Sequence, residues 1–264
     1  MEQGIKKYEE LRFADAFMFC KVMTNYPDIC KEVVELCIGQ KVCNICYKEG
    51  EKTIGLSPEY KGIRLDVYLE DVYHTIYDLE MQTVSKTDLG KRIRYYDSIM
   101  SLNSLALGKA YKELPNSYIV FICLFDPFKE NRVIYEFKRR ETEDPKLLLG
   151  DGTTDILINV YGDACNYPDE MREFLDAVKG QVTGDGISKK IDNAVREVRS
   201  HKKWRTEYML YELLMQESKE EGRRQTLLEN IRSLMAKYDL TADAAMDVLE
   251  VSEEERQDLK AGLS

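Results

Sequence analysis

Long apolar runs and export signals are absent from this 264-residue chain. No stretch of about 18 apolar residues occurs, so the sequence predicts no membrane-spanning helix and no membrane partner. The segment Met1–Lys7 has neither an apolar core nor a small-residue cleavage site, so we expect no secretory signal and predict a cytoplasmic location. Ile, Leu, Val, Phe and Tyr nevertheless recur throughout the chain, which excludes wholesale disorder.

The cysteines lack the pattern of a disulfide framework or of a complete zinc site. Their number, seven, is odd, and no export signal is expected, so disulfides are not predicted. Cys43 and Cys46 form one C-x-x-C pair, but no second pair and no histidine pair at metal spacing follows. Cys30 and Cys37 lie in a helical pattern, where buried thiols are common. A zinc-stabilised regulator is therefore the weakest hypothesis.

Positive charge is in short supply over the chain as a whole. The sequence has 38 basic and 48 acidic residues, a formal net charge of −10. A protein whose entire surface grips nucleic acid is usually basic, because neutralising phosphates drives that binding. Residues 86–112 are the exception, with six Lys or Arg against two Asp. Contact with nucleic acid is therefore expected around this segment.

Hydrophobic periodicity predicts a mixed α/β domain followed by a helical tail, and we place the boundary between residues 1–202 and 203–264. The run from Tyr118 to Phe125 is continuously apolar, as in a central strand covered on both faces. The other predicted strands are 41–56 (in part), a hairpin over 62–83 with its turn near 70–72, 132–138 and 156–161. The predicted helices are 7–39 with a break near 25–27, 87–107, 168–178, 187–199 and 203–238.

The hairpin over 62–83 carries the most informative pattern. Successive side chains of a strand point to opposite faces, so Ile63, Leu65, Val67 and Leu69 are expected together on the core face. The other face is then a polar stripe made of Arg64, Asp66, His74, Asp78, Glu80 and Gln82.

Asp66 and Glu80 are expected within a residue or two of being opposite each other on this hairpin. Two carboxylates held together repel unless something neutralises them. Mg²⁺ does so readily, because it prefers carboxylate oxygens, water and substrate phosphate. The alternative is ordinary solvation, since acidic residues are common on the outer face of an antiparallel hairpin.

The helix that follows adds cations beside this pair. Lys91, Arg94, Tyr95 and Ser98 share one side of it, at helical spacing. A metal-ready acidic pair next to cations is the arrangement that phosphodiester hydrolysis needs, because the metal activates water while the cations hold flanking phosphates.

These motifs together resemble a known family. Asp66 and Glu80, with thirteen residues between them, and Gln82 after them are similar to the PD-(D/E)XK nuclease signature in its E-x-Q form. More narrowly, the chain resembles the Rpn-type recombination-promoting nucleases, also described as PD-(D/E)XK nuclease family transposases, over roughly residues 9–235. The supporting runs are Asp15–Lys21, Arg92–Tyr96, Tyr118–Phe128 with its final Phe-Asp-Pro-Phe, and Glu220–Arg224.

The resemblance implies a restriction-endonuclease-like mixed sheet flanked by helices and a Mg-dependent deoxyribonuclease linked to recombination or mobile elements. Asp66 and Glu80 would bind Mg²⁺ (or Mn²⁺), and Asp15 would assist directly or through water. Gln82 would position the attacking water where many relatives carry a lysine. Lys86, Lys91, Arg94 and Tyr95 would contact DNA.

Glutamine in place of the motif lysine leaves alternatives open. It can orient water but supplies no charge and no base. Either metal-bound water loses its proton unaided, or Lys86 or Lys91 reaches in, or activity is weak. The competing hypothesis is a catalytically inactive binding or assembly protein that keeps the nuclease fold, which the net charge of −10 and the tail also suit.

The tail over 203–264 is expected to be one long amphipathic helix and two short ones. Thr241 is the predicted cap of the first short helix, and Ser252 with Glu255 forms a predicted capping box for the second. Its acidic balance makes it a poor DNA arm. Homo-oligomerisation, packing on the nuclease core and partner binding remain its candidate roles.

Overall fold

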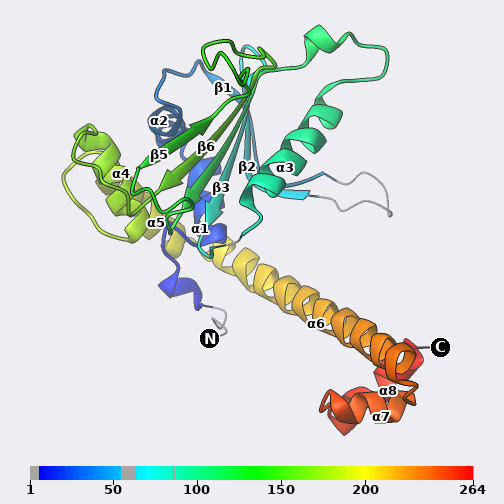
Figure 1. Ribbon diagram of the computed structural model, residues 1–264. Helices are drawn as coiled ribbons and strands as arrows, with labels where there is room; N and C mark the ends of the chain where they lie inside the picture. Colours follow the sequence, from blue (N-terminus) through cyan, green and yellow to red (C-terminus); the bar gives the residue numbers. More distant parts are fainter. Residues whose placement is uncertain (1–5, 55–62, 86, 264) are drawn as a thin grey trace. The chain divides into compact units, whose positions relative to one another are not determined.

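The computed structural model describes residues 6–54, 63–85 and 87–263 (Figure 1). Internal contacts divide this part of the chain into two units, Lys6–His201 and a unit that begins at Lys202, and each is described by itself. Across the described ranges, no helix is both long enough and apolar enough to cross a membrane.

Six strands in the described residues form one mixed sheet with the order β1-β2-β3-β4-β6-β5. β1, β2 and β3 pair antiparallel, β3, β4 and β6 pair parallel in turn, and β5 closes the edge antiparallel to β6. The predicted mixed α/β sheet is therefore confirmed. The strands are β1 Ile45–Ile54, β2 Ile63–Asp71, β3 Ile76–Gln82, β4 Ser117–Cys123, β5 Ile134–Phe137 and β6 Thr153–Asn159.

Helices cover both faces of this sheet (Figure 1). The helix α3 lies on one face and forms the connection between the parallel strands β3 and β4, while α1 and α2 lie on the other face with α4 and α5 packed beside them. The bounds are α1 Ala16–Asn25, α2 Pro27–Ile38, α3 Leu89–Ser104, α4 Asp169–Lys179 and α5 Ile187–Ser200.

The first predicted helix is shorter than expected at its start. A 3-10 turn spans Tyr8–Glu10, and α1 begins only at Ala16, because the carboxylate of Asp15 accepts the backbone N–H of Arg12 and holds a turn there. The predicted break is confirmed: Tyr26 separates α1 from α2, whose first residue is Pro27, a position where a missing N–H costs nothing.

The prediction that side chains of β2 alternate strictly between the two faces of the sheet is wrong at one point. Ile63, Leu65 and Tyr68 lie in the same core cluster, although an even and an odd position should face opposite ways. The change of face falls at Asp66, where the pairing with β1 is interrupted and the opposing residue, Glu51, has a φ of +56°. The expected grouping of Leu65 with Val67 therefore does not hold.

The hairpin turn lies slightly later than predicted, between the end of β2 at Asp71 and the start of β3 at Ile76. The carboxylate of Asp71 holds it by accepting the backbone N–H groups of Tyr73 (2.8 Å) and Thr75 (3.0 Å). The hydroxyl of Tyr77 donates to the same carboxylate at 2.9 Å.

The C-terminal unit has its own small core. It consists of α6 (Lys202–Tyr238), α7 (Ala242–Val248) and α8 (Glu253–Ala261), whose buried residues include Ile231, Met246 and Leu259. The predicted cap at Thr241 is confirmed, since its hydroxyl accepts the N–H of Ala244 at 3.2 Å.

The predicted capping box at the start of α8 is wrong in detail. The hydroxyl of Ser252 donates to the carboxylate of Glu255 at 2.8 Å and makes no cap bond to the backbone. The hydroxyl has a strong charged acceptor within reach, and this side-chain bond replaces the bond to the exposed N–H groups.

Core packing beneath the sheet generates a stability prediction. Phe19 in α1 is fully buried and packs edge-on against Phe13, with ring centroids 5.4 Å apart. Phe19→Ala should lower the free energy of unfolding by about 3–5 kcal/mol in urea denaturation, because it leaves a cavity. Tyr111→Ala, at a side chain that is 86% exposed, should change it by less than about 0.5 kcal/mol. Equal effects would contradict the assignment of this core.

Candidate active site

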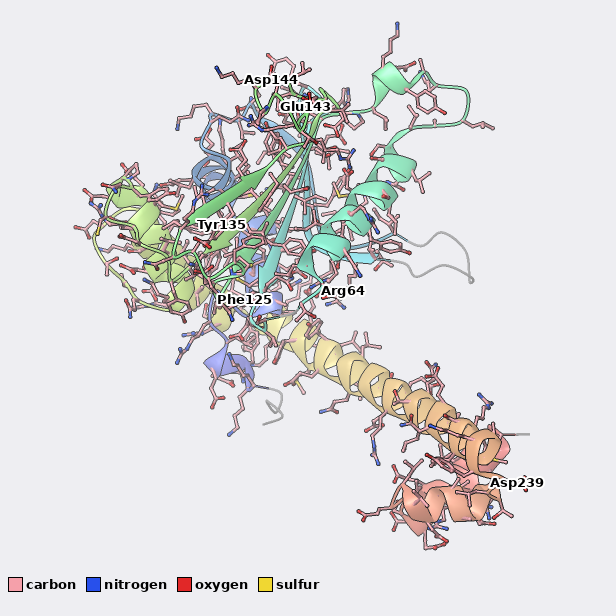
Figure 2. The ribbon with its side chains drawn as sticks, viewed as in Figure 1. Arg64, Phe125, Tyr135, Glu143, Asp144 and Asp239 are labelled. Carbon is pink, nitrogen blue, oxygen red and sulfur yellow. The ribbon has the colours of Figure 1, made fainter. Side chains whose placement is uncertain are left out.

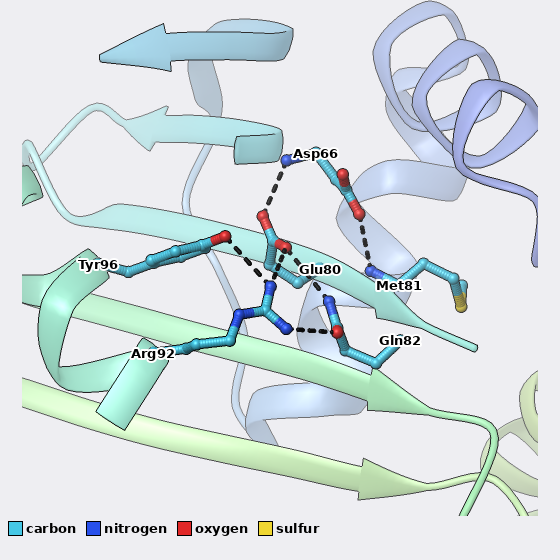
Figure 3. Close-up of polar contacts among 6 residues, drawn as sticks. All are labelled: Asp66, Glu80, Met81, Gln82, Arg92 and Tyr96. Carbon is cyan, nitrogen blue, oxygen red and sulfur yellow. Dashed lines mark hydrogen bonds and ion pairs between the residues drawn. The ribbon is translucent and has the colours of Figure 1, made fainter. Parts of the chain in front are cut away.

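The backbone pairing of β2 with β3 stops where Asp66 and Glu80 lie opposite each other. The last paired residues are Val67 and Leu79, so the next pair in register is Asp66 with Glu80. There each carboxylate bonds the opposite strand instead: Glu80 Oε1 accepts the N–H of Asp66 at 2.9 Å, and Asp66 Oδ2 accepts the N–H of Met81 at 3.0 Å. The strands separate, and two carboxylates occupy the gap (Figure 3).

Gln82 and Arg92 complete a polar network around Glu80 (Figure 3). The side-chain amide of Gln82 donates to Glu80 Oε2 at 3.4 Å and accepts from Arg92 Nη1 at 2.8 Å. Arg92 reaches down from α3 and places Nη2 4.0 Å from Glu80 Oε2. It also donates to the hydroxyl of Tyr96 at 3.2 Å and lies over the ring of Phe121. The guanidinium is thus packed from several sides next to the carboxylates.

Asp78 adds a third carboxyl group on the same face of β3. It is fully buried, and neither of its oxygens has a hydrogen-bond partner within the described residues. An unpaired buried carboxyl group is costly, because it loses its hydration without a replacement. Burial and the nearby charge of Asp66 raise the pKa of Asp78 well above its usual range.

The pKa values of the other two carboxyl groups move in the same direction. Burial is the main cause at Glu80, followed by the charges of Asp78 and Asp66. Burial also raises the pKa of Asp66, although the hydrogen bond from Met81 opposes it. A nearby positive charge would therefore stabilise the ionised form of each carboxyl group.

Solvation of an outer hairpin face does not explain these acids. Every residue of β3 is buried, and the exposed fractions of Asp78, Glu80 and Gln82 are 0%, 3% and 8%. β3 is an inner strand covered by α3, so its polar side chains lie inside the protein. The alternative of a solvated stripe is wrong for these three residues.

The donor set suits a hard cation that brings its own water. In the part of the chain that the structure describes, no three His, Cys, Asp or Glu side chains are grouped as ready metal ligands. Mg²⁺ commonly binds through one or two carboxylates and completes its shell with water and substrate phosphate. The pair Asp66 and Glu80 fits that pattern, and its assignment as metal ligands stays a prediction.

Asp15, and Arg64 and His74 of the predicted stripe, bond to residues outside this network. The carboxylate of Asp15 pairs with Lys6 Nζ at 2.6 Å, and within residues 6–54 and 63–85 no hydrogen bond links it to the acidic pair. Arg64 pairs with Glu51 at 3.1 Å. His74 pairs with Glu70 in the hairpin turn. The polar stripe expected from alternation is therefore divided into separate contacts.

The predicted DNA-contacting residues lie on α3. Lys91 and Arg94 are exposed, whereas Tyr95 is half-buried against the core cluster. Lys86 lies outside the described residues. The same helix thus carries Arg92 toward the carboxylates and two exposed cations on another side.

The cysteines belong to no group of three possible metal ligands among the described residues. All seven fall in the described part of the chain and are free, with Cys43 and Cys46 exposed. Burial raises the pKa of Cys20, Cys30 and Cys37 to about 12, as expected of thiols with a packing role.

The mixed sheet, with Asp66 and Glu80 on adjacent strands and an E-x-Q run in the second, is similar to the arrangement that the sequence resemblance implies. Residues 32–154 match the family model described as PD-(D/E)XK nuclease family transposase. The match confirms the resemblance found in the sequence over that segment, and it supports a nuclease role; nucleases of this class generally use divalent metals. No curated protein and no solved structure is similar enough to this chain to count as a match.

Two residues of the network were not among the predicted site residues. Asp78 was within reach of sequence reasoning, because the alternation that selects Glu80 and Gln82 also places Asp78 on that face. Arg92 was visible only as one of several cations on a helix. Nothing in the helical spacing distinguishes it from Lys91, since its role depends on where α3 crosses the sheet.

The buried carboxyl group of Asp78 generates a pH prediction. Its raised pKa means that the folded protein holds the proton more tightly than the unfolded chain, so stability falls as pH rises above the usual carboxyl range. Asp78→Asn should therefore raise the free energy of unfolding of the metal-free protein near neutral pH. The gain should shrink as pH falls toward the unfolded value. Urea denaturation at several pH values measures it.

Asp126 is the matched control, because its pKa is shifted in the opposite direction. Burial alone would raise its pKa, but hydrogen bonds from Tyr135 and from backbone N–H groups hold it below the usual range. Asp126→Asn should lower stability near neutral pH, and the loss should fade as pH falls. If both variants shifted stability in the same direction, the account of Asp78 would be wrong.

Proposed function

We propose that this chain is a metal-dependent DNA endonuclease that hydrolyses phosphodiester bonds at Asp66 and Glu80. One observation carries the proposal: the partly buried carboxylate of Asp66 and the buried carboxylate of Glu80 each hold a backbone N–H of the opposite strand at the point where the pairing of β2 with β3 ends. Carboxyl groups whose pKa values are raised by burial and by neighbouring acids are typical of functional sites.

Asp66 and Glu80 would hold Mg²⁺ (or Mn²⁺). When bound, the cation supplies Lewis-acid stabilisation of the phosphate and lowers the pKa of its water. The chain's own contribution is orientation: a single backbone hydrogen bond fixes each carboxylate, so little reorganisation is needed on binding. Asp15, bound to Lys6, would act at most from outside this pair.

Gln82 would orient water, and Arg92 would supply the charge that glutamine lacks. The amide of Gln82 is held between Glu80 and Arg92, so its direction is fixed. The guanidinium of Arg92 is permanently charged and offers several donors in a fixed geometry. Its position 4.0 Å from Glu80 stabilises the ionised carboxylate that a metal requires.

DNA would be bound through the exposed side of α3. Lys91 and Arg94 are exposed there, and Lys86 precedes the helix. Such contacts supply affinity without sequence preference. Tyr95 would add a partly buried aromatic contact. A role in recombination or in the movement of genetic elements is in line with the description of the matched family.

A second candidate function is a catalytically inactive nuclease-fold protein that binds a partner or assembles through its C-terminal helices. The observation that favours it is the occupied amide of Gln82, which bonds protein groups on both sides where a motif lysine would stand. Calorimetry separates the two functions: the endonuclease binds Mg²⁺ or Mn²⁺ near neutral pH, and the inactive protein does not.

Cleavage of plasmid DNA tests the proposed function. The protein should convert supercoiled DNA to nicked and linear forms with Mg²⁺ and not with a chelator. Asp66→Ala and Glu80→Ala should each lower the rate about 100-fold or more, since loss of even indirect supports of a metal commonly costs 10- to 100-fold. Circular dichroism controls for folding. Parent-like cleavage by either variant would show that its carboxylate is not a ligand.

Arg92 and Lys91 should differ in kinetics, although they are neighbours on α3. Arg92→Gln should reduce kcat with little change in KM, because it removes the charge beside Glu80, and Arg92→Lys should recover part of the rate. Lys91→Gln should mainly raise KM and weaken the salt dependence of DNA binding, as expected of a phosphate contact. If Arg92→Gln instead acted only on KM, Arg92 would be a DNA contact.

A further inference from the structure

A cavity that does not include the carboxylate pair lies on the α3 side of the sheet. It encloses about 390 Å³, within the range of about 300–1,000 Å³ that small-molecule sites occupy. Its walls come from the start of α3, the loop after β4, and the strands β5 and β6. The loop contains the Phe-Asp-Pro-Phe run, which the proposed chemistry leaves without a role.

Two phenylalanines form an aromatic wall of this cavity. Phe128 and Phe137 are each 45% exposed, and their rings lie 5.3 Å apart at a tilt of 54°. Phe128 also packs edge-on against Tyr135, at 4.9 Å between centroids. Exposed ring faces in a concave site offer a stacking surface for a planar ligand.

The loop that carries Phe128 is held in a fixed conformation. The carboxylate of Asp126 accepts the backbone N–H groups of Phe128 (3.1 Å) and Asn131 (2.8 Å), and the hydroxyl of Tyr135 at 2.9 Å. Lys129 and Asn131 have φ values of +61° and +55°, a conformation that non-glycine residues rarely adopt. Figure 2 labels Phe125 and Tyr135, which flank this loop in the chain. Such local strain marks a loop whose shape matters.

Asp155 provides an acceptor in the same cavity. It lies in β6 among the lining residues, and its Oδ1 is buried without a hydrogen-bond partner in the described chain. Burial, with the nearby charge of Asp97, raises the pKa of Asp155 to about 6. A ligand that stacks on the rings and donates an N–H group would bond this carboxylate where it lines the cavity.

The cavity adjoins the site through α3. Gly90 and Ile93 line the cavity, while Arg92 between them contacts Gln82 beside the carboxylate pair. Lys91 and Arg94 are exposed on the same turns. A polyanion bound to Lys91 and Arg94 would pass close to both the cavity and the carboxylate pair.

We propose that this cavity binds a nucleobase of the DNA strand on which the carboxylate pair acts, stacked on Phe128 and Phe137 with an N–H group of the base donating to Asp155. The proposal rests on the proposed function. A cationic side chain of a protein partner would also suit rings and a carboxylate, but Lys91 and Arg94 repel a cation and attract a phosphate.

Oligonucleotide binding to the full chain, kept free of divalent metal so that no cleavage occurs, tests the proposal. The probe is a single strand carrying one fluorescent 2-aminopurine, and its partner probe has an abasic site there. The parent should quench the fluorescence and bind the first probe more tightly. Phe137→Ala should weaken that binding about 5- to 150-fold, the usual cost of losing one stacked base, and leave the abasic probe unaffected. Phe137→Tyr should restore the difference.

Asp155→Asn should reduce the preference for bases with an exocyclic amino group over thymine. Tyr111→Ala, at an exposed aromatic outside the cavity, should leave the affinity for both probes unchanged.

The proposal is overturned if the parent protein binds the two probes with equal affinity. It is also overturned if an arginine amide displaces the 2-aminopurine and free nucleosides do not. If the base effect is present but the protein cuts no DNA, the proposed function fails and the cavity stands; if it cuts without a base effect, the cavity assignment fails alone.

Discussion

Beyond Val67 and Leu79, β2 and β3 stop bonding to each other through their backbones, and the carboxylates of Asp66 and Glu80 take over. Buried backbone N–H groups must find acceptors, so the gap between two inner strands would be costly if it were left empty. The reciprocal bonds satisfy both strands and at the same time fix two acids close together. The separation of the two strands and the acidic site are thus one feature of the sheet, because the same two carboxylates form both.

The cost of that feature is concentrated negative charge in the protein interior. Glu80 and Asp78 are almost or wholly inaccessible, and burial raises the pKa of both. Removing a carboxylate from water is tolerated when a cation lies nearby or when the group keeps its proton. Arg92 supplies part of the compensation from α3. The proposed divalent cation would supply the rest, which links the electrostatics of the fold to its proposed chemistry.

The helix α3 connects the separate parts of this site. It joins the parallel strands β3 and β4, and Arg92 in its first turns reaches Gln82 and Glu80. Arg92 points inward, Lys91 and Arg94 are exposed, and Ile93 lines the aromatic cavity. Because one rigid element holds all of these groups, a DNA strand bound to its exposed side would meet the carboxylates and the cavity in a fixed order.

Local rules of the chain determined much of this architecture. The period of two predicted that Asp66 and Glu80 lie within a residue or two of being opposite each other, and Pro27 predicted the division between α1 and α2. Only the tertiary structure decided that β3 is an inner strand, that Arg92 rather than Lys91 approaches Glu80, and that β2 changes face at Asp66. Periodicity describes the faces of one element, whereas burial and contact depend on which other elements cover those faces, and that information lies far away along the chain.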